Sequence, residues 1–174
     1  MRALVAFGTK YGTTGQVADE IAAVLRQGMT EVDVLDLRNG KCPDLGGYDL
    51  FVVGSAIHMG AWTKEADTFL KERSPELAKK RTSLFVCCGD VVLQRSPIDE
   101  CRKKYLEDVA AKHSLAPERT GLFGGVLDFS KYGFLVKALL NGAKKDFERK
   151  GLDMSKPYDF RDWDQIRAWA RSLM

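Results

Sequence analysis

The stretch ALVAFGTKYGTTG at residues 3–15 decides the fold of this chain. Residues 3–7 are an unbroken apolar run, which is typical of a strand buried on both faces of a parallel sheet. The run ends at Gly8, and apolar residues then recur at helical spacing as far as Gly28. These residues are Val17, Ala18, Ile21, Ala22 and Leu25. The chain therefore opens with a buried strand, a loop rich in glycine and threonine, and an amphipathic helix.

The same alternation continues to the end of the chain. Further strands are predicted at residues 32–37, 50–53, 83–88 and 120–127, and further helices near residues 62–77, 97–109 and 162–173. Five buried strands that alternate with amphipathic helices predict an open α/β sheet with helices on both faces. A length of 174 residues fits one domain, which we place at residues 1–174.

Proline and capping residues locate several helix ends. Pro75 is expected to break or end the second helix. Ser96 is the expected N-cap of the third helix, with Pro97 in the first helical position. Asp162 is the expected N-cap of the last helix, and Gln165 three residues later completes the capping pattern.

Residues 128–161 lie between the fifth strand and the last helix and exceed what the minimal alternation needs. We interpret them as an insertion that contains a helix from Tyr132 to Phe147 with one apolar stripe. Such a stripe packs against a core or a second copy of the chain, or it touches a membrane surface. The sequence therefore leaves a homodimer open.

Composition excludes several classes of protein. Apolar residues make up 45% of the chain, charged residues 29%, and the net charge is +3, which is the profile of a soluble globular protein. No apolar run approaches the roughly 20 residues of a transmembrane helix, and we find no export signal at the N-terminus. The excess of 27 basic over 24 acidic residues is too small to argue for a nucleic-acid partner.

The four cysteines, Cys42, Cys87, Cys88 and Cys101, include no Cys-x-x-Cys pair for zinc or dithiol chemistry. Their low density favours the reducing cytoplasm over a disulfide-stapled secreted domain, and we expect no metal site. Cys87 and Cys88 are neighbours on a strand and point to opposite faces, so we expect apolar packing rather than a disulfide between them.

The loop after the first strand favours a phosphate ligand. Sheets of this kind bind ligands at the carboxyl ends of their strands, near the switch in strand order. Residues 8–15 combine threonine hydroxyls and glycines with a helix N-terminus, whose free N–H groups attract an anion. The spacing excludes a nucleoside-triphosphate loop, because Thr13 and not lysine follows Gly12, and a dinucleotide loop, because that pattern's first glycine is missing. The plainer alternative is that these residues only cap the helix.

This loop resembles that of the flavodoxin family, which reads Thr/Ser-x-Thr-Gly-x-Thr. Thr9, Gly12 and Thr14 match it, and Tyr11 replaces the middle threonine. The resemblance implies a five-stranded parallel sheet in the order 2-1-3-4-5, with FMN at the switch between strands one and three. It also implies that FMN contacts residues after strands one, three and four. These are Thr9, Lys10, Tyr11, Gly12, Thr13, Thr14, Ser55, Ala56, Ile57, His58, Met59, Gly60, Trp62, Cys88, Gly89, Asp90 and Val91.

Three side chains of that set are candidate packing surfaces for the flavin ring, namely His58, Met59 and Trp62. Trp62 has an alternative interpretation as the first core residue of the second helix, and His58 as a hydrogen-bonded scaffold residue. The sequence assigns no catalytic residue.

The whole chain also resembles the quinone-linked protoporphyrinogen dehydrogenases, which are flavodoxin-like enzymes of similar length. The matching features are Tyr48 and Asp49 leading into residues 52–57, the insertion after strand five, and the pair Asp162 and Trp163. This resemblance implies oxidation of protoporphyrinogen IX with a quinone as acceptor.

The sequence thus leaves three functions open. The leading prediction is an FMN-binding carrier that exchanges electrons with a ferredoxin or a low-potential oxidoreductase. The quinone-linked dehydrogenase is the alternative enzyme. A flavin-free module that binds another phosphate compound is the third.

Overall fold

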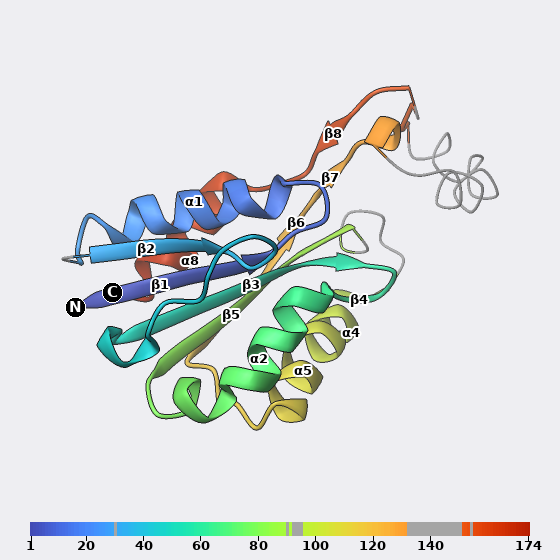
Figure 1. Ribbon diagram of the computed structural model, residues 1–174. Coiled ribbons are helices and arrows are strands. Elements are labelled where there is room, and N and C mark those ends of the chain that lie inside the picture. Colours follow the sequence, from blue (N-terminus) through green and yellow to red (C-terminus); the bar gives the residue numbers. More distant parts are fainter. Residues whose placement is uncertain (30, 90, 92–95, 132–150, 154) are drawn as a thin grey trace.

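A central parallel sheet organises the computed structural model, which describes residues 1–29, 31–89, 91, 96–131, 151–153 and 155–174. Its strands are β1 (Arg2–Gly8), β2 (Glu31–Asp36), β3 (Leu50–His58), β5 (Arg81–Cys88) and β6 (Arg119–Gly124). They lie in the order β2-β1-β3-β5-β6, and each pair along this path is parallel (Figure 1). The predicted order 2-1-3-4-5 is confirmed, and the switch in strand order falls between β1 and β3.

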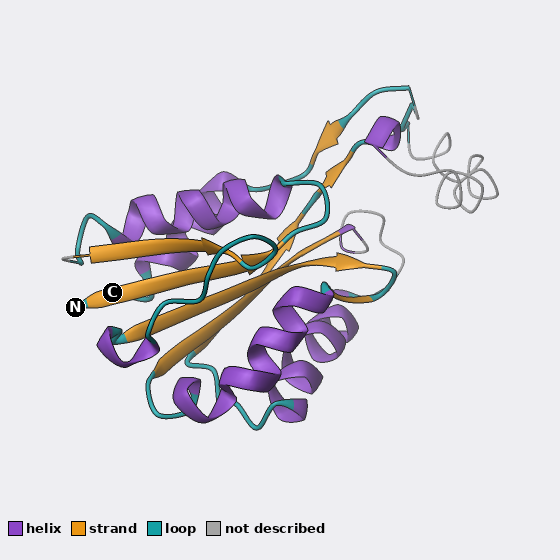
Figure 2. Ribbon diagram, in the orientation of Figure 1, coloured by secondary structure: helices purple, strands orange, loops and turns teal. Residues whose placement is uncertain are grey.

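Helices cover both faces of this sheet (Figure 2). One face carries α1 (Thr13–Leu25) and α8 (Trp163–Arg171), and the other carries α2 (Lys64–Leu77), α4 (Ile98–Arg102) and α5 (Asp108–Lys112). Successive strand residues alternate between the two cores: Phe51 packs on the α2 side and Val52 on the α1 side. Because both faces are buried, the strands read in the sequence as continuous apolar runs.

Cys87 and Cys88 follow the same alternation. Cys87 packs in the core on the α1 side and Cys88 in the core on the α2 side, and neither forms a disulfide. Burial raises the pKa of the Cys87 thiol to about 12, so the thiol stays protonated at neutral pH. The predicted packing role is confirmed.

Two prolines lie near helix ends. Pro75 lies in the last turn of α2, which ends at Leu77, so the predicted end of this helix near Pro75 is confirmed. The side chains of Leu70 and Leu77 are fully buried, and their packing holds the last turn although the proline supplies no N–H. Pro97 is the N-cap of α4 and not its first helical residue, so Ser96 does not cap this helix.

The remaining helices show one deviation and one confirmation. A π-helical turn, η2 (Lys103–Glu107), joins α4 to α5 where the periodicity predicts a continuous helix. It adds one residue to the repeat, so that Tyr105 and Leu106 are both buried. At the last helix the predicted cap is confirmed, because Asp162 Oδ1 accepts a hydrogen bond from the backbone N–H of Gln165 at 2.9 Å.

The predicted fifth strand is wrong in extent, because residues 120–127 belong to two strands. After β6 ends at Gly124, β7 (Val126–Leu127) pairs antiparallel with β8 (Tyr158–Asp159) in a separate ribbon. The backbone of Phe160 lies against Gly124, where a Cβ would overlap its carbonyl oxygen. The returning chain therefore divides the predicted strand in two.

The predicted insertion, residues 128–161, is described only at its ends. It starts with the 3-10 turn η3 (Phe129–Lys131) and returns through β8; a similar turn, η1 (Leu45–Gly47), precedes β3. The predicted helix from Tyr132 to Phe147 lies outside the described residues. Among the helices that the structure describes, none is both long enough and apolar enough to cross a membrane.

Candidate functional site

The loop between β1 and α1 is a tight turn at the switch in strand order. Thr9 Oγ1 accepts a hydrogen bond from the backbone N–H of Gly12 at 3.0 Å, and Gly12 O accepts one from Gly15 N at 3.1 Å. Gly12 is the N-cap of α1 with a φ of 90°, a conformation that favours glycine, and apart from Gly12 and its two chain neighbours no described residue lies within 4 Å of the place its Cβ would occupy. The loop therefore offers open space beside a helix N-terminus.

Thr14 carries the strongest sign that this space holds a ligand. Its residue is 0% exposed, and within the described chain Oγ1 has no hydrogen-bond partner. The hydroxyl interacts with the Cys87 thiol, but not in hydrogen-bond geometry. Leaving a buried hydroxyl unsatisfied costs about 1–3 kcal/mol, which a bound acceptor would relieve.

The charge balance of this loop suits an anion. The first turn of α1 has no acidic residue, so no carboxylate of its own occupies the positive end of the helix dipole. Thr9 accepts a hydrogen bond through its oxygen, which leaves its hydroxyl hydrogen free to donate. Tyr11, Gly12 and Thr13 are half-buried and Lys10 is exposed at the edge.

The predicted loop after strand three is in fact a β-hairpin. β3 continues through Ser55, Ala56 and Ile57 to His58, and pairs antiparallel with β4 (Ala61–Trp62). Between the strands, Met59 and Gly60 have φ values of 52° and 75°, as a two-residue turn with mirror-image geometry requires. Met59 is 74% exposed at the tip of this hairpin. This turn lets β3 extend beyond the sheet and fold back on itself. Residues 55–58 are therefore strand and not loop, which corrects the prediction.

Two predicted site residues of the hairpin are used inside the fold. Ser55 is fully buried, and its hydroxyl donates to Ala56 O and accepts from Thr63 N, each at 2.9 Å. Trp62 is 7% exposed, and its Nε1–H donates to Tyr105 O at 2.6 Å. These contacts favour the core interpretation of Trp62 over a surface for the flavin ring.

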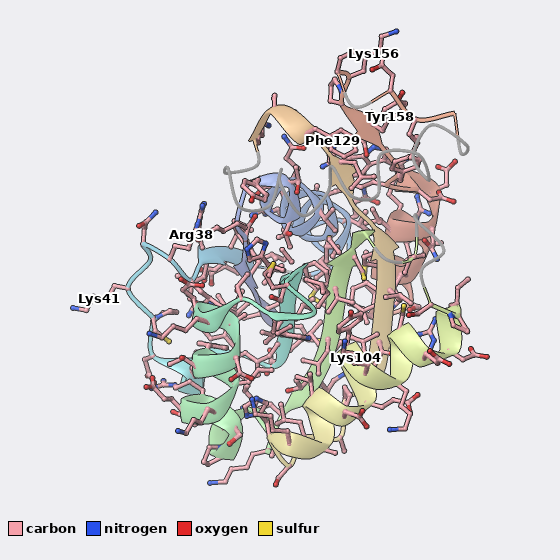
Figure 3. The ribbon with its side chains drawn as sticks, turned by 90° about the vertical axis from the view of Figure 1, so that its right-hand side faces the viewer. Arg38, Lys41, Lys104, Phe129, Lys156 and Tyr158 are labelled. Atoms are coloured by element: carbon pink, nitrogen blue, oxygen red, sulfur yellow. The ribbon has the colours of Figure 1, made fainter. Side chains whose placement is uncertain are left out.

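The first loop and the hairpin meet at an aromatic contact. The rings of Tyr11 and His58 pack edge to face with their centroids 6.2 Å apart. Figure 3 shows the molecule from the side toward which the strands run in Figure 1, with Lys104 of η2 and, elsewhere on this side, Phe129 and Tyr158 from the described ends of the insertion. The structure thus brings together the site residues predicted after strand one and those predicted after strand three.

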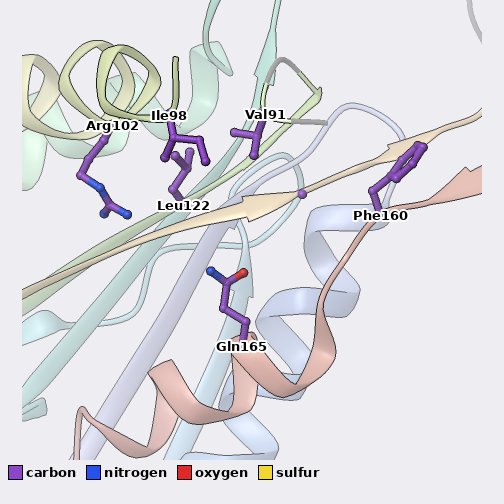
Figure 4. Close-up of a pocket in the computed structure, with 7 residues that line it drawn as sticks. Val91, Ile98, Arg102, Leu122, Phe160 and Gln165 are labelled. Atoms are coloured by element: carbon purple, nitrogen blue, oxygen red, sulfur yellow. The ribbon is translucent and has the colours of Figure 1, made fainter. Parts of the chain in front are cut away.

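The site residues predicted after strand four are described in part. Cys88 is fully buried at the end of β5, and Gly89 and Val91 are half-buried; Asp90 lies outside the described residues. Val91 lines a cavity of about 300 Å³ at the edge of the sheet, beside β6 (Figure 4). Its other lining residues are Ile98, Arg102, Leu122, Gly124, Phe160 and Gln165.

Sequence reasoning missed one residue of this region. Arg161 follows β8, and its guanidinium reaches the first turn of α1, where it donates to Thr13 O and to the side chain of Gln16. No local motif marks such a residue, because its partners are almost 150 positions away.

A loop rich in glycine and threonine at the β1–β3 switch of a sheet in the order β2-β1-β3-β5-β6 is typical of a flavodoxin-like protein. The comparison with known families agrees: the Flavodoxin domain matches residues 4–151, so the chain belongs to this family. The family places a flavin cofactor at this edge, and the donors of Thr9 and Thr14 and the space beside Gly12 fit the phosphate of such a group.

Individual relatives and a solved structure also resemble this chain. The chain is 22% identical to the protoporphyrinogen IX dehydrogenase [quinone] of Escherichia coli K12, over 99% of this chain and 94% of the relative. It is 24% identical to the Leishmania major protein of the same name, over 97% of this chain and 73% of the relative. Among solved structures, the flavodoxin of Streptococcus pneumonia TIGR4 has a TM-score of 0.58 at 16% identity and covers 99% of this chain and 97% of that one, which shows a shared fold.

Proposed function

We propose that this chain binds FMN non-covalently and transfers electrons through it. The observation that carries the proposal is the buried Thr14 hydroxyl, which has no hydrogen-bond partner in the part of the chain that the structure describes and lies at a helix N-terminus beside Thr9 and the open space at Gly12. A phosphate monoester supplies the acceptor oxygens that this arrangement lacks. FMN, when bound, supplies the redox chemistry, and the protein binds and orients it.

The side chains around the proposed ring site have separate tasks. The Tyr11–His58 contact holds the first loop against the β3–β4 hairpin, so the phosphate end and the ring end stay in fixed relation. Met59 at the hairpin tip is apolar and exposed. In this proposal its side chain covers one side of the flat flavin ring. The buried side chains of Ser55 and Trp62 hold the hairpin in place through hydrogen bonds inside the fold, and they do not contact the flavin ring.

The relatives favour a specific reaction within this class. Both are named for the dehydrogenation of protoporphyrinogen IX with a quinone, and the match to the Escherichia coli protein runs over nearly the full length of both chains. We therefore propose this dehydrogenation as the second, finer function. The cavity beside Val91 supports it, because the apolar side chains of Ile98, Leu122 and Phe160 accompany the guanidinium of Arg102. Such a lining suits a large apolar molecule that carries a carboxylate.

Turnover separates the enzyme from an electron carrier. We expect the FMN-loaded chain to oxidise protoporphyrinogen IX with a quinone as acceptor, and the rate to fall when Arg102 is replaced by methionine. Porphyrin fluorescence under anaerobic conditions measures the rate, and Arg119→Met on the same edge of the sheet is the matched control. If the chain shows no turnover but accepts electrons from a low-potential oxidoreductase, the dehydrogenase proposal is wrong and the carrier proposal stands.

A further inference from the structure

The guanidinium of Arg161, the last residue of the insertion, joins the end of the insertion to the first turn of α1. The side chain is 8% exposed. Nε and Nη2 donate to the Asp159 carboxylate at 2.8 Å and 2.6 Å, and the charge stands over the ring of Trp163 at 4.5 Å. Nη1 donates to Gln16 Oε1 at 2.6 Å and to Thr13 O at 3.3 Å. Four of the five guanidinium N–H donors are thus engaged, which fixes the orientation of the group.

These contacts act on the proposed phosphate site through the backbone. The Thr13 carbonyl and the Thr14 N–H belong to the same peptide unit. A hydrogen bond from a cation to that carbonyl polarises the unit and makes its N–H a stronger donor. It also fixes the helical turn that carries the Thr14 hydroxyl. Since Asp159 pairs with the Arg161 charge, the effect on a ligand comes mainly from this positioning and not from a bare cation.

We propose that Arg161 is a positioning residue for the flavin phosphate, so that cofactor affinity depends on the C-terminal end of the insertion. The inference rests on the proposed FMN site. It goes beyond that site because the Flavodoxin domain match ends at residue 151, and Arg161 lies after it. The insertion and the cofactor loop are thereby linked through one side chain.

Arg167 provides a matched control for a purely structural role. Arg167 lies in α8 and bridges to α1, with Nη1 donating to Glu20 Oε1 of α1 at 3.0 Å and Nη2 to Asp164 Oδ1 of α8 at 2.8 Å. Its partner Glu20 lies further along α1 than Thr13 and Gln16, outside the first turn. A variant at Arg167 therefore removes another arginine contact to α1 without touching the phosphate loop.

The test compares FMN with riboflavin, which lacks the phosphate. Full-length chains carrying Arg161→Met, Arg161→Lys or Arg167→Met are loaded with either flavin, and the dissociation constant is read from the fluorescence released on dilution. We expect Arg161→Met to weaken FMN binding roughly tenfold, the effect of one lost charge-assisted hydrogen bond, and to change riboflavin binding less than about twofold. Arg161→Lys keeps the charge but not the forked donors, so the loss for FMN persists; Arg167→Met leaves both affinities within about twofold.

Two results would overturn the inference. One is FMN affinity within twofold of the unmodified chain in both Arg161 variants; the other is an equal loss for FMN and riboflavin, which marks a general structural role. If Arg161→Met does not fold in a urea titration, Arg161→Lys decides the question alone. Failure of the proposed function is a different result: the unmodified chain then binds FMN no more tightly than riboflavin.

Discussion

Alanine at both Thr9 and Thr14 is expected to weaken FMN binding by roughly 30- to 1000-fold, or about 2–4 kcal/mol for two hydrogen bonds to a charged phosphate. Thr14→Ala removes the buried hydroxyl that has no hydrogen-bond partner among the described residues, so it lowers affinity without breaking a described hydrogen bond. Thr9→Ala also removes the contact to the Gly12 N–H and loosens the turn. Both changes lower affinity for the phosphate and not for the ring.

Isothermal titration of the double variant with FMN measures this effect. Thr68→Ala, at an exposed position of α2, is the matched control and should leave affinity unchanged. A loss of less than about threefold in the double variant would place the phosphate elsewhere, since even one weak hydrogen bond contributes about that much.

Gly54→Ala is expected to destabilise the protein by about 3 kcal/mol, at the upper end of the cost of overpacking a core. Gly54 lies in β3 between Phe7 of β1 and Phe85 of β5 in the sheet register. A Cβ at this position would overlap the ring of Phe85, which is fully buried and packs against the rings of Phe123 and Trp169.

Urea denaturation gives the change in unfolding free energy for this variant. Gly125→Ala is the control, because the nearest atoms to its Cβ position lie 3.9 Å away, an ordinary contact distance. Equal stabilities of the two variants would mean that the ring of Phe85 repacks freely and that the central strands are less tightly packed than described.

The fold was largely predictable because its signals are local. Continuous apolar runs mark strands buried on both faces, and the Asp162 cap lies within three residues of its partner. The missed features depend on distant residues. The division of the last strand requires Phe160 to lie against Gly124, and the extension of β3 requires Met59 to accept a positive φ, which its side chain does not announce.

In the candidate site, too, some features depend on local residues and others on residues distant in the sequence. Thr9, Gly12 and Thr14 are candidates that one contiguous loop indicates, and the geometry of that loop is set within six residues. Ser55 is a candidate only through the resemblance to flavodoxins, and the sequence does not show that its hydroxyl accepts a hydrogen bond from Thr63 N. Arg161 could not be found, because neither its charge nor its neighbours in the sequence indicate a partner at the other end of the chain.

The most direct test of FMN binding is the absorbance spectrum of the purified chain after incubation with FMN and removal of free flavin by gel filtration. We expect flavin bands at one FMN per chain, and no retained flavin when riboflavin replaces FMN at a concentration near the FMN dissociation constant. A protein that stays colourless after incubation with FMN would contradict it.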